Sequence, residues 1–413
     1  MTLANQPTMR AATLGLFAAV FIGAGVPLMM FGRAVMQADL AIALLMALGL
    51  AYVRTGTYAH AMNAGRNIFG LALLLTATSW LPGLLHSVDP ASSFKAWARS
   101  FAFIAGAGVI WALLNDNEKE RALSLKAFMT ISCATLGAAA ISLLIWPGFV
   151  NILRGLGDVI PRPELVLKSF GATAMCLVPV LVWGGRRLGG RWIAAGLIAT
   201  ALAVIVIFQT SNRASIAGLM AMILVCALVL GIRDKRTRLP MLIGAPIVVA
   251  GMFAWLQIFG PSWLQTKSTY LPTWLVDPHR QMIWQFTFEH AMQAPWFGHG
   301  IDTINLLPGA DINIRGMGQS YIPSHPHNWT MEILAETGWI GLSVFVATLL
   351  ILAVRLARAT LANQSPAVNL TLLALSTGFW TSALFNFSIW STWWLLTYFV
   401  LFALVAAWRE PKT

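Results

Sequence analysis

The sequence predicts an all-α fold, a polytopic transmembrane helical bundle of about twelve spans with one large, partly helical loop on the outer side. Hydrophobic residues make up 58% of the 413 positions and charged residues only 10%. Soluble domains carry about 25% charged residues, so the composition excludes an ordinary soluble protein. Apolar stretches of about twenty residues, the length that crosses a bilayer, recur along almost the whole chain.

The expected spans cover residues 11–32, 38–53, 67–86, 96–114, 127–149, 168–185, 191–210, 214–232, 239–260, 337–354, 368–387 and 391–408. The first stretch follows Arg10 in the manner of a secretory signal, but it is longer than a signal's apolar core, so we expect an uncleaved helix. The cysteines fall inside expected spans and indicate neither a disulfide framework nor a metal site: Cys133, Cys176 and Cys226.

Basic residues set the expected orientation of the bundle. With a cytoplasmic amino terminus, most of the 27 Lys and Arg residues fall on the cytoplasmic side, as the positive-inside rule requires. The resulting topology is multi-pass with both termini in the cytoplasm. The net charge of +12 is then largely a topology signal, so we expect no nucleic-acid partner.

The chain divides into three expected parts: residues 1–260 with the first nine spans, a long outer loop over 261–336, and residues 337–413 with the last three spans. The loop is too aromatic for a disordered spacer, and long loops in compact proteins are often functional. Within it, residues 280–293 have helical periodicity, Pro295 and the glycines after it predict a turn, and residues 301–323 predict irregular structure.

Cationic residues gather on the outer side: Arg154 and Arg162 in the loop 150–167, Lys168 at the next span, Arg213 at the start of a helix, and Arg280 in the long loop. An arginine at the start of a helix can bind a phosphate group. The free backbone N–H groups and the helix dipole there favour an anion, and the guanidinium adds further hydrogen-bond donors. The alternatives are that Arg213 reaches lipid headgroups, that Arg280 is merely solvated, and that the other three anchor the protein to lipid.

The stretch SHPHNWTMEILAETGWIGL, residues 324–342, holds two candidate histidines. With an unperturbed pKa of about 6.5, His327 is neutral often enough to act as a general base. It can instead bind a sugar or have a structural role, and such roles are favoured for His325, which two prolines flank. Glu332 and Glu336 share one helix face and are expected to orient or cap neighbouring groups. A zinc site remains a further alternative, with the ligands His299, Asp302, His325 and His327.

Three patterns resemble the O-antigen ligase family of bacterial inner-membrane glycosyltransferases. The first is His327-Asn328 followed after nine residues by Gly338-Trp339-Ile340-Gly341. The second is the turn Ser211-Asn212-Arg213 at the head of a helix, and the third runs from Arg280 to Pro295-Trp296-Phe297-Gly298. The superfamily also holds O-antigen polymerases and protein O-oligosaccharyltransferases, and these stay as alternatives.

The resemblance implies a GT-C-like membrane enzyme of lipopolysaccharide biosynthesis with its active site facing the periplasm. Its donor would be a polysaccharide on undecaprenyl pyrophosphate, its acceptor a sugar hydroxyl of lipid A-core, and the transfer would invert the anomeric centre without a metal or other cofactor. His327 would be the catalytic base. The substrate-binding residues would be Arg213, Arg280, His325, Arg154, Arg162 and Lys168. A transporter of lipid-linked sugars is the alternative of another class, although its ionisable residues would lie near the bilayer midplane.

Overall fold

The computed structural model describes residues 9–54, 67–157, 160–240, 243–244, 247, 277–314, 316 and 318–409. Within these residues the fold is all-α, as predicted, and the only bridge between extended residues pairs Asn313 with Ser320. Eight of the described helices are long and apolar enough to cross a membrane, which makes this a multi-pass helical protein. Two shorter apolar helices lie near the ends of the described chain.

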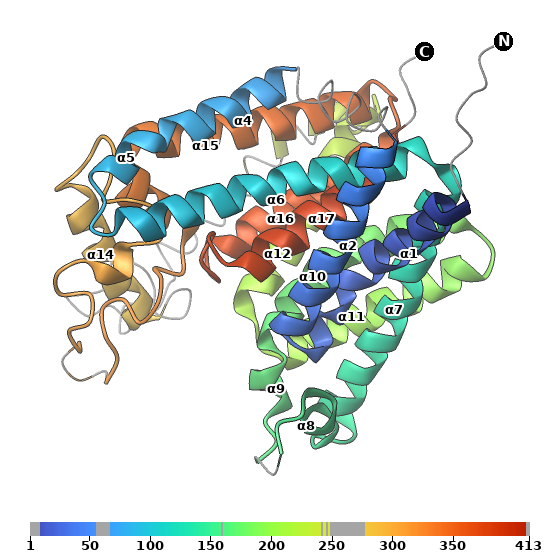
Figure 1. The fold of residues 1–413 in the computed structure, drawn as a ribbon, viewed down its shortest axis with the longest axis horizontal. Coiled ribbons are helices and arrows are strands. Elements are labelled where there is room, and N and C mark those ends of the chain that lie inside the picture. Colours follow the sequence, from blue (N-terminus) through green and yellow to red (C-terminus); the bar gives the residue numbers. More distant parts are fainter. Residues whose placement is uncertain are drawn as a thin grey trace.

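The helices follow one another as α1 (Met9–Gly25), η1 (Pro27–Phe31), α2 (Arg33–Val53), α4 (Ile68–Ser79), α5 (Leu81–Leu85), α6 (Pro90–Asp116), α7 (Glu118–Leu144), α8 (Phe149–Arg154), α9 (Pro163–Val166), α10 (Lys168–Leu188), α11 (Arg191–Gln209), α12 (Arg213–Arg233), α14 (Pro278–Ala291), η3 (Ile304–Leu306), α15 (Trp329–Leu361), α16 (Pro366–Ala383) and α17 (Thr392–Ala406). In Figure 1, α4 lies along α15 across the top of the molecule and α14 stands at one end.

Eleven of the twelve expected spans correspond to described helices, and the remaining one, 239–260, lies mostly outside the described residues. Four helices start well before the expected spans: α2, α6, α7 and α15, which begin at Arg33, Pro90, Glu118 and Trp329. Helix α15 begins at Trp329, not 337, because the Asn328 side chain accepts hydrogen bonds from the backbone N–H groups of Thr330 and Met331. Helix α2 begins at Arg33, because a 3₁₀ turn from Pro27 replaces the end of the first expected span.

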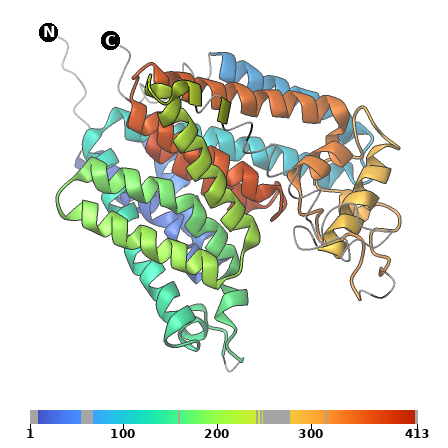
Figure 2. The same cartoon turned by 180° about the vertical axis from the view of Figure 1, so that it is seen from behind.

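Helix α10 is the centre of the bundle. In its membrane-length window 72% of the residues are buried, against 22% in α12, whose outer face remains exposed. Apolar side chains on such an outer face suit contact with lipid, where they need no protein partner. Helices α7, α11 and α16 pack around α10. Figure 2 shows the bundle from the side opposite to that in Figure 1.

Helix α15 is broken at Gly338, whose φ of 68° is in the left-handed region. The backbone of residues 295–300 lies across the break: Trp339 N donates to Pro295 O at 2.7 Å, and His299 N donates to Ala335 O at 2.9 Å. A Cβ on Gly338 would overlap the carbonyl of Trp296, and a Cβ on Gly298 would overlap the backbone at Glu336. Gly298 and Gly338 therefore allow the same close contact between two backbones. The turn at residues 295–300 makes the hydrogen bonds that α15 lacks at its break.

Candidate functional site

The connection between α16 and α17, residues 384–391, contacts several side chains of the long loop at one end of the bundle. Its backbone carbonyls accept hydrogen bonds from three side chains of the long loop: Arg280 Nη1 donates to Phe385 O at 2.7 Å, and His325 and His327 both reach Asn386 O. The Asn386 Nδ2 amide is itself buried without a hydrogen-bond partner in the described structure. Sequence reasoning missed this segment, although its polar residues Asn386 and Ser388 between two apolar helices were a usable signal.

The two histidines lie against each other, with ring centroids 4.1 Å apart. His325 Nε2 is 3.3 Å and His327 Nδ1 is 3.0 Å from the carbonyl oxygen of Asn386. His327 has a φ of 55°, a left-handed conformation that is uncommon for a residue with a side chain and is found at strained functional positions. This conformation lets two residues only two positions apart share one acceptor.

The hydrogen bonds distinguish the two imidazoles chemically. A carbonyl only accepts, so His327 Nδ1 carries the proton and its Nε2 keeps a free lone pair in the neutral form. His325 donates from Nε2 to the same carbonyl, which leaves its Nδ1 to accept from the Ser324 hydroxyl at 2.8 Å. In the described structure His327 therefore presents a basic nitrogen, whereas both nitrogens of His325 are engaged.

Burial and the positive charge of Arg280 lower the pKa of His327 to about 4, partly offset by the hydrogen bond to Asn386 and by Asp277. Burial and the charge of His327 lower the pKa of His325 to about 3, and Arg280 and Arg33 act in the same direction. Both rings are therefore neutral near neutral pH.

Arg280 is at the start of α14, where Asp277 caps the helix and pairs with the guanidinium at 3.2 Å. Burial lowers the pKa of Arg280, Asp277 raises it, and the charge of Arg213 lowers it again. Arg213 and Arg280 thus lie within electrostatic range although α12 and α14 are far apart in sequence. Donors on the Arg280 guanidinium remain free of these contacts, since the group has five N–H bonds.

Arg213 is the exposed first residue of α12. Asn212 before it accepts a hydrogen bond from Ser215 N at 3.3 Å, and its Nδ2 donates to Lys168 O, at the start of α10, at 3.1 Å. The amide of Asn212 thus holds two helix starts together, each with an exposed cation as its first residue. The two helix starts therefore lie at the same end of the bundle, where the helix dipoles favour an anion.

Arg33, which sequence reasoning did not select, is the first residue of α2 at the same end. Its guanidinium stacks 5.1 Å from the Trp393 ring and donates to Ser169 Oγ at 3.2 Å. The charge of Arg33 contributes to lowering the pKa values of both His325 and Arg154. The signal in the sequence was the same as for Arg213, an arginine directly after a turn and before an apolar run.

The remaining expected cations differ in their surroundings. Arg154 donates to three backbone carbonyls, those of Met29, Met30 and Val166, so its guanidinium fastens α8 to η1 and α9. Arg162 is exposed in the loop before α9, and only its backbone carbonyl makes a hydrogen bond to the described residues around it. The structure therefore groups Arg213, Arg280 and the histidines, while Arg154 is engaged structurally and Arg162 stands apart.

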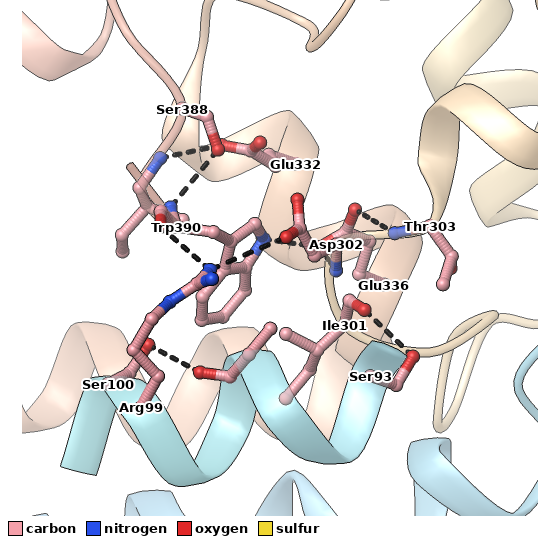
Figure 3. Close-up of polar contacts among 12 residues, drawn as sticks. Ser93, Arg99, Ser100, Ile301, Asp302, Thr303, Glu332, Glu336, Ser388 and Trp390 are labelled. Atoms are coloured by element: carbon pink, nitrogen blue, oxygen red, sulfur yellow. Dashed lines mark hydrogen bonds and ion pairs between the residues drawn. The ribbon is translucent and has the colours of Figure 1, made fainter. Parts of the chain in front are cut away.

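Glu332 and Glu336 share one buried face of α15, as predicted, and brace the loop. The Glu336 carboxylate accepts from the backbone N–H groups of Asp302, Thr303 and Ile304 at 2.9–3.2 Å and from the Trp390 indole. Glu332 accepts from Ile389 N at 2.9 Å. Figure 3 shows these carboxylates between the loop and the 384–391 connection, with Arg99 of α6 reaching both Asp302 and the Trp390 carbonyl.

The four residues considered for zinc do not gather. His299 Nε2 lies 2.8 Å from the carbonyl of His290, and Asp302 pairs with Arg99 at 3.5 Å. In the described parts of the chain no three His, Cys, Asp or Glu side chains come together in a way that could hold a metal ion.

Comparison with known proteins gives a partial match centred on this site. Residues 198–346 match a family model described as O-antigen ligase, a range that holds Arg213, Arg280, His325, His327 and Gly338. Curated relatives named "Putative polysaccharide ligase" come from Rickettsia typhi and Rickettsia prowazekii, both 26% identical over 136 residues, and from Rickettsia conorii, 27% identical over 133 residues. The alignments cover 31%, 31% and 30% of this chain and the same shares of the relatives' own lengths.

Proposed function

Because residues 198–346 match the O-antigen ligase family, we propose that the protein is a membrane glycosyltransferase that joins a polysaccharide, carried on undecaprenyl pyrophosphate, to a sugar hydroxyl of lipid A-core. The observation that carries the proposal is the free Nε2 of His327 within electrostatic range of Arg280, which in turn lies within range of Arg213. An acceptor hydroxyl needs a base, and a pyrophosphate leaving group needs cations.

In the proposed reaction the acceptor oxygen attacks the anomeric carbon of the donor. Its proton passes to Nε2 of His327 as the bond from the anomeric carbon to the phosphate oxygen breaks. The electron pair of that bond remains on the lipid pyrophosphate, whose added negative charge Arg213, Arg280 and Arg33 would stabilise. A single displacement of this kind inverts the anomeric centre.

The cation arrangement supports an anion between helices. Arg213, Lys168 and Arg33 are each the first residue of a helix, where backbone N–H groups and the helix dipole add to the side-chain charge. Burial is the main cause of the lowered pKa of Arg280, and the charge of Arg213 adds to it; a pyrophosphate between the two arginines would relieve this repulsion. Arg154, Arg162 and His325 fit supporting roles: Arg154 through its carbonyl contacts, Arg162 at the exposed edge, and His325 by orienting its neighbour.

We also propose the membrane in which the protein lies and its orientation there. The helix starts with Arg33, Lys168 and Arg213 would face the periplasm and the arginine-rich opposite end the cytoplasm of a bacterial inner membrane, with both termini cytoplasmic. The division of the chain into residues 1–260, 261–336 and 337–413 would then separate nine membrane helices, a periplasmic active-site loop and three closing helices.

The test is a reconstituted reaction with purified protein, lipid-linked polysaccharide and lipid A-core. We expect joined product from the wild-type protein and a loss of about 10²–10⁴-fold for His327→Ala, the usual contribution of a general base. His325→Ala is the matched variant and should lose much less activity, because it leaves the basic nitrogen of His327 in place. Wild-type product that forms only between two lipid-linked glycans would identify a polymerase, glycosylated protein as the product would identify a protein O-oligosaccharyltransferase, and flipping of lipid-linked sugar without transfer would identify a transporter.

A further inference from the structure

A large cavity lies at the other end of the bundle, away from the histidines. It has a volume of about 1520 Å³ and is bounded by residues of α4, α6, α15 and α17, helices that lie near one another in Figure 1. Cavities for drug-sized molecules range from about 300 to 1,000 Å³, so this one suits a larger ligand. None of His325, His327, Arg213 and Arg280 lines it.

The lining of the cavity is mostly apolar and includes a group of arginines. Aromatic and aliphatic side chains contribute most of it, among them Phe69, Leu73, Ile104, Phe399 and Phe402. Five arginines also line it: Arg121, Arg187, Arg355, Arg358 and Arg409. An apolar cavity with a group of arginines matches a molecule that has an anionic head and hydrocarbon chains.

None of the five arginines that line the cavity forms an ion pair with a carboxylate among the described residues. The ion pairs formed among the described residues use other cations, namely Arg54, Arg99 and Arg280. Arg355 donates to the amide oxygen of Asn67 at 3.0 Å, which is a neutral group. Burial and then the charge of Arg355 lower the pKa of Arg409 to about 10, so these two lining cations lie within electrostatic range of each other.

Two donors among the lining residues have no acceptor. Arg121 Nε and Trp408 Nε1 are buried and make no hydrogen bond within the described part of the chain. Arg121 and Arg187 both stack on the Trp408 ring, with centroid distances of 4.8 and 4.7 Å, and so bring their charges together. Buried donors usually have a partner, and a phosphate group offers several acceptor oxygens to both arginines and to the indole.

We propose that this cavity binds an acidic phospholipid, with its phosphate among Arg121, Arg187, Arg355, Arg358 and Arg409 and its acyl chains along Phe69, Ile104 and Phe402. The site is independent of the glycosyltransferase reaction and lies on the opposite side of the bundle. The bound lipid supplies the anion that the clustered arginines lack and fills the space between the α4–α15 pair and the rest of the bundle.

The test measures lipid retained by the full-length protein. Delipidated protein is reconstituted with an equal mixture of phosphatidylglycerol and phosphatidylcholine, extracted into detergent, and weighed by native mass spectrometry. We expect one retained phosphatidylglycerol per protein. The triple variant Arg355→Gln, Arg358→Gln and Arg409→Gln should bind it on the order of a hundredfold more weakly, since each basic residue near an anionic lipid contributes roughly fivefold.

Matched variants separate a site from general charge. Arg186→Gln, Arg191→Gln and Arg236→Gln remove the same charge from positions that do not line the cavity, and this triple should retain the lipid. Gly108→Leu places a side chain in the cavity, and Gly49→Leu on α2 is its control, because a Cβ at either glycine meets open space. Gly108→Leu should displace the lipid without lowering the unfolding temperature of the delipidated protein.

Three results would overturn the proposal. Equal loss of phosphatidylglycerol in both arginine triples would indicate ordinary boundary lipid. Equal retention of phosphatidylcholine would remove the role of the phosphate-binding charges, because selectivity for the acidic headgroup would be absent. Retention of a polyprenyl-linked glycan in place of phospholipid would assign the cavity to the tail of the sugar donor.

Discussion

At the residue scale, the difference between His325 and His327 is set by one carbonyl. Both rings donate to Asn386 O, but from different nitrogens, and only His327 keeps Nε2 free of described partners. The sequence favoured His327 through its spacing to Gly338, and the hydrogen bonds supply an independent reason for the same choice. Whether the free nitrogen takes a proton during catalysis stays a prediction.

The pH dependence of the free enzyme tests the state of His327. Burial and Arg280 lower its pKa to about 4, so the neutral, basic form persists as pH falls until that value. We expect kcat/KM for joined product to stay level from about pH 8 to about pH 5 and to drop only near pH 4. An acid limb near the ordinary histidine value of about 6.5 would contradict this environment.

Substituting Arg280 by glutamine gives the matched experiment. Without the positive charge that holds the pKa of His327 down, the acid limb of the residual activity should move to higher pH, and kcat should fall because the leaving group loses a cation. Arg280→Lys keeps the charge and should leave the limb near its original position. An unchanged limb in Arg280→Gln would show that the guanidinium does not act on His327.

The lowered histidine pKa values also affect stability. Unfolded histidine takes up a proton near pH 6.5, whereas the folded His327 and His325 do so only near pH 4 and 3. The unfolded chain therefore binds more protons in this window, and the free energy of unfolding falls as pH falls through it. The unfolding temperature of the wild-type protein should therefore fall between about pH 7 and pH 5. The double variant His325→Asn and His327→Asn should show a smaller fall over the same range.

At the element scale, the break in α15 places the site. Residues 329–337 form a short helical segment that continues the span at an angle, and the turn 295–300 hydrogen-bonds to the backbone on both sides of Gly338. Gly341 supports the same region, because its carbonyl accepts from the Trp80 indole at 3.3 Å. The nine residues between Asn328 and Gly338 thus correspond to the helical segment between the proposed base and the break.

Replacing Gly338 by alanine should disrupt this element. A left-handed φ alone costs a residue with a Cβ about 1–2 kcal/mol, and overlap with the Trp296 carbonyl adds to that. We expect a lower unfolding temperature and little joined product. Gly137→Ala on α7, where a Cβ meets open space, should change neither, and equal behaviour of the two variants would remove the role assigned to the break.

At the scale of the whole molecule, charge is partitioned between two ends of an apolar bundle. The end with the two histidines gathers Arg33, Lys168, Arg213 and Arg280, and the opposite end gathers the arginines of the proposed lipid cavity. A buried ion pair joins helices at that second end: Arg54 after α2 and Glu120 of α7 lie 2.7 Å apart, with only 14% and 4% of their side chains exposed. The pair links α2 to the start of α7 where both reach α1.

Breaking this pair should destabilise the bundle. Glu120→Gln leaves Arg54 buried without its counter-charge, which typically costs about 3–5 kcal/mol. Glu118→Gln, on the same helix but exposed, is the control and should be near neutral. Denaturation midpoints in a defined detergent measure both, and equal midpoints would show that water reaches Arg54 despite its burial.

The sequence by itself determined the helical class and most span positions, because apolar length is a local property that the bilayer selects. The side of the membrane on which each cation lies stays a prediction from the positive-inside rule. The sequence also pointed to His327, Arg213 and Arg280. Only the tertiary structure decided that residues 384–391 supply the shared carbonyls, that Arg33 joins the cations at the end with the two histidines, and that Arg154 is engaged by backbone. These depend on which helices pack together, and contacts between residues far apart in the chain leave no periodicity in the sequence to detect.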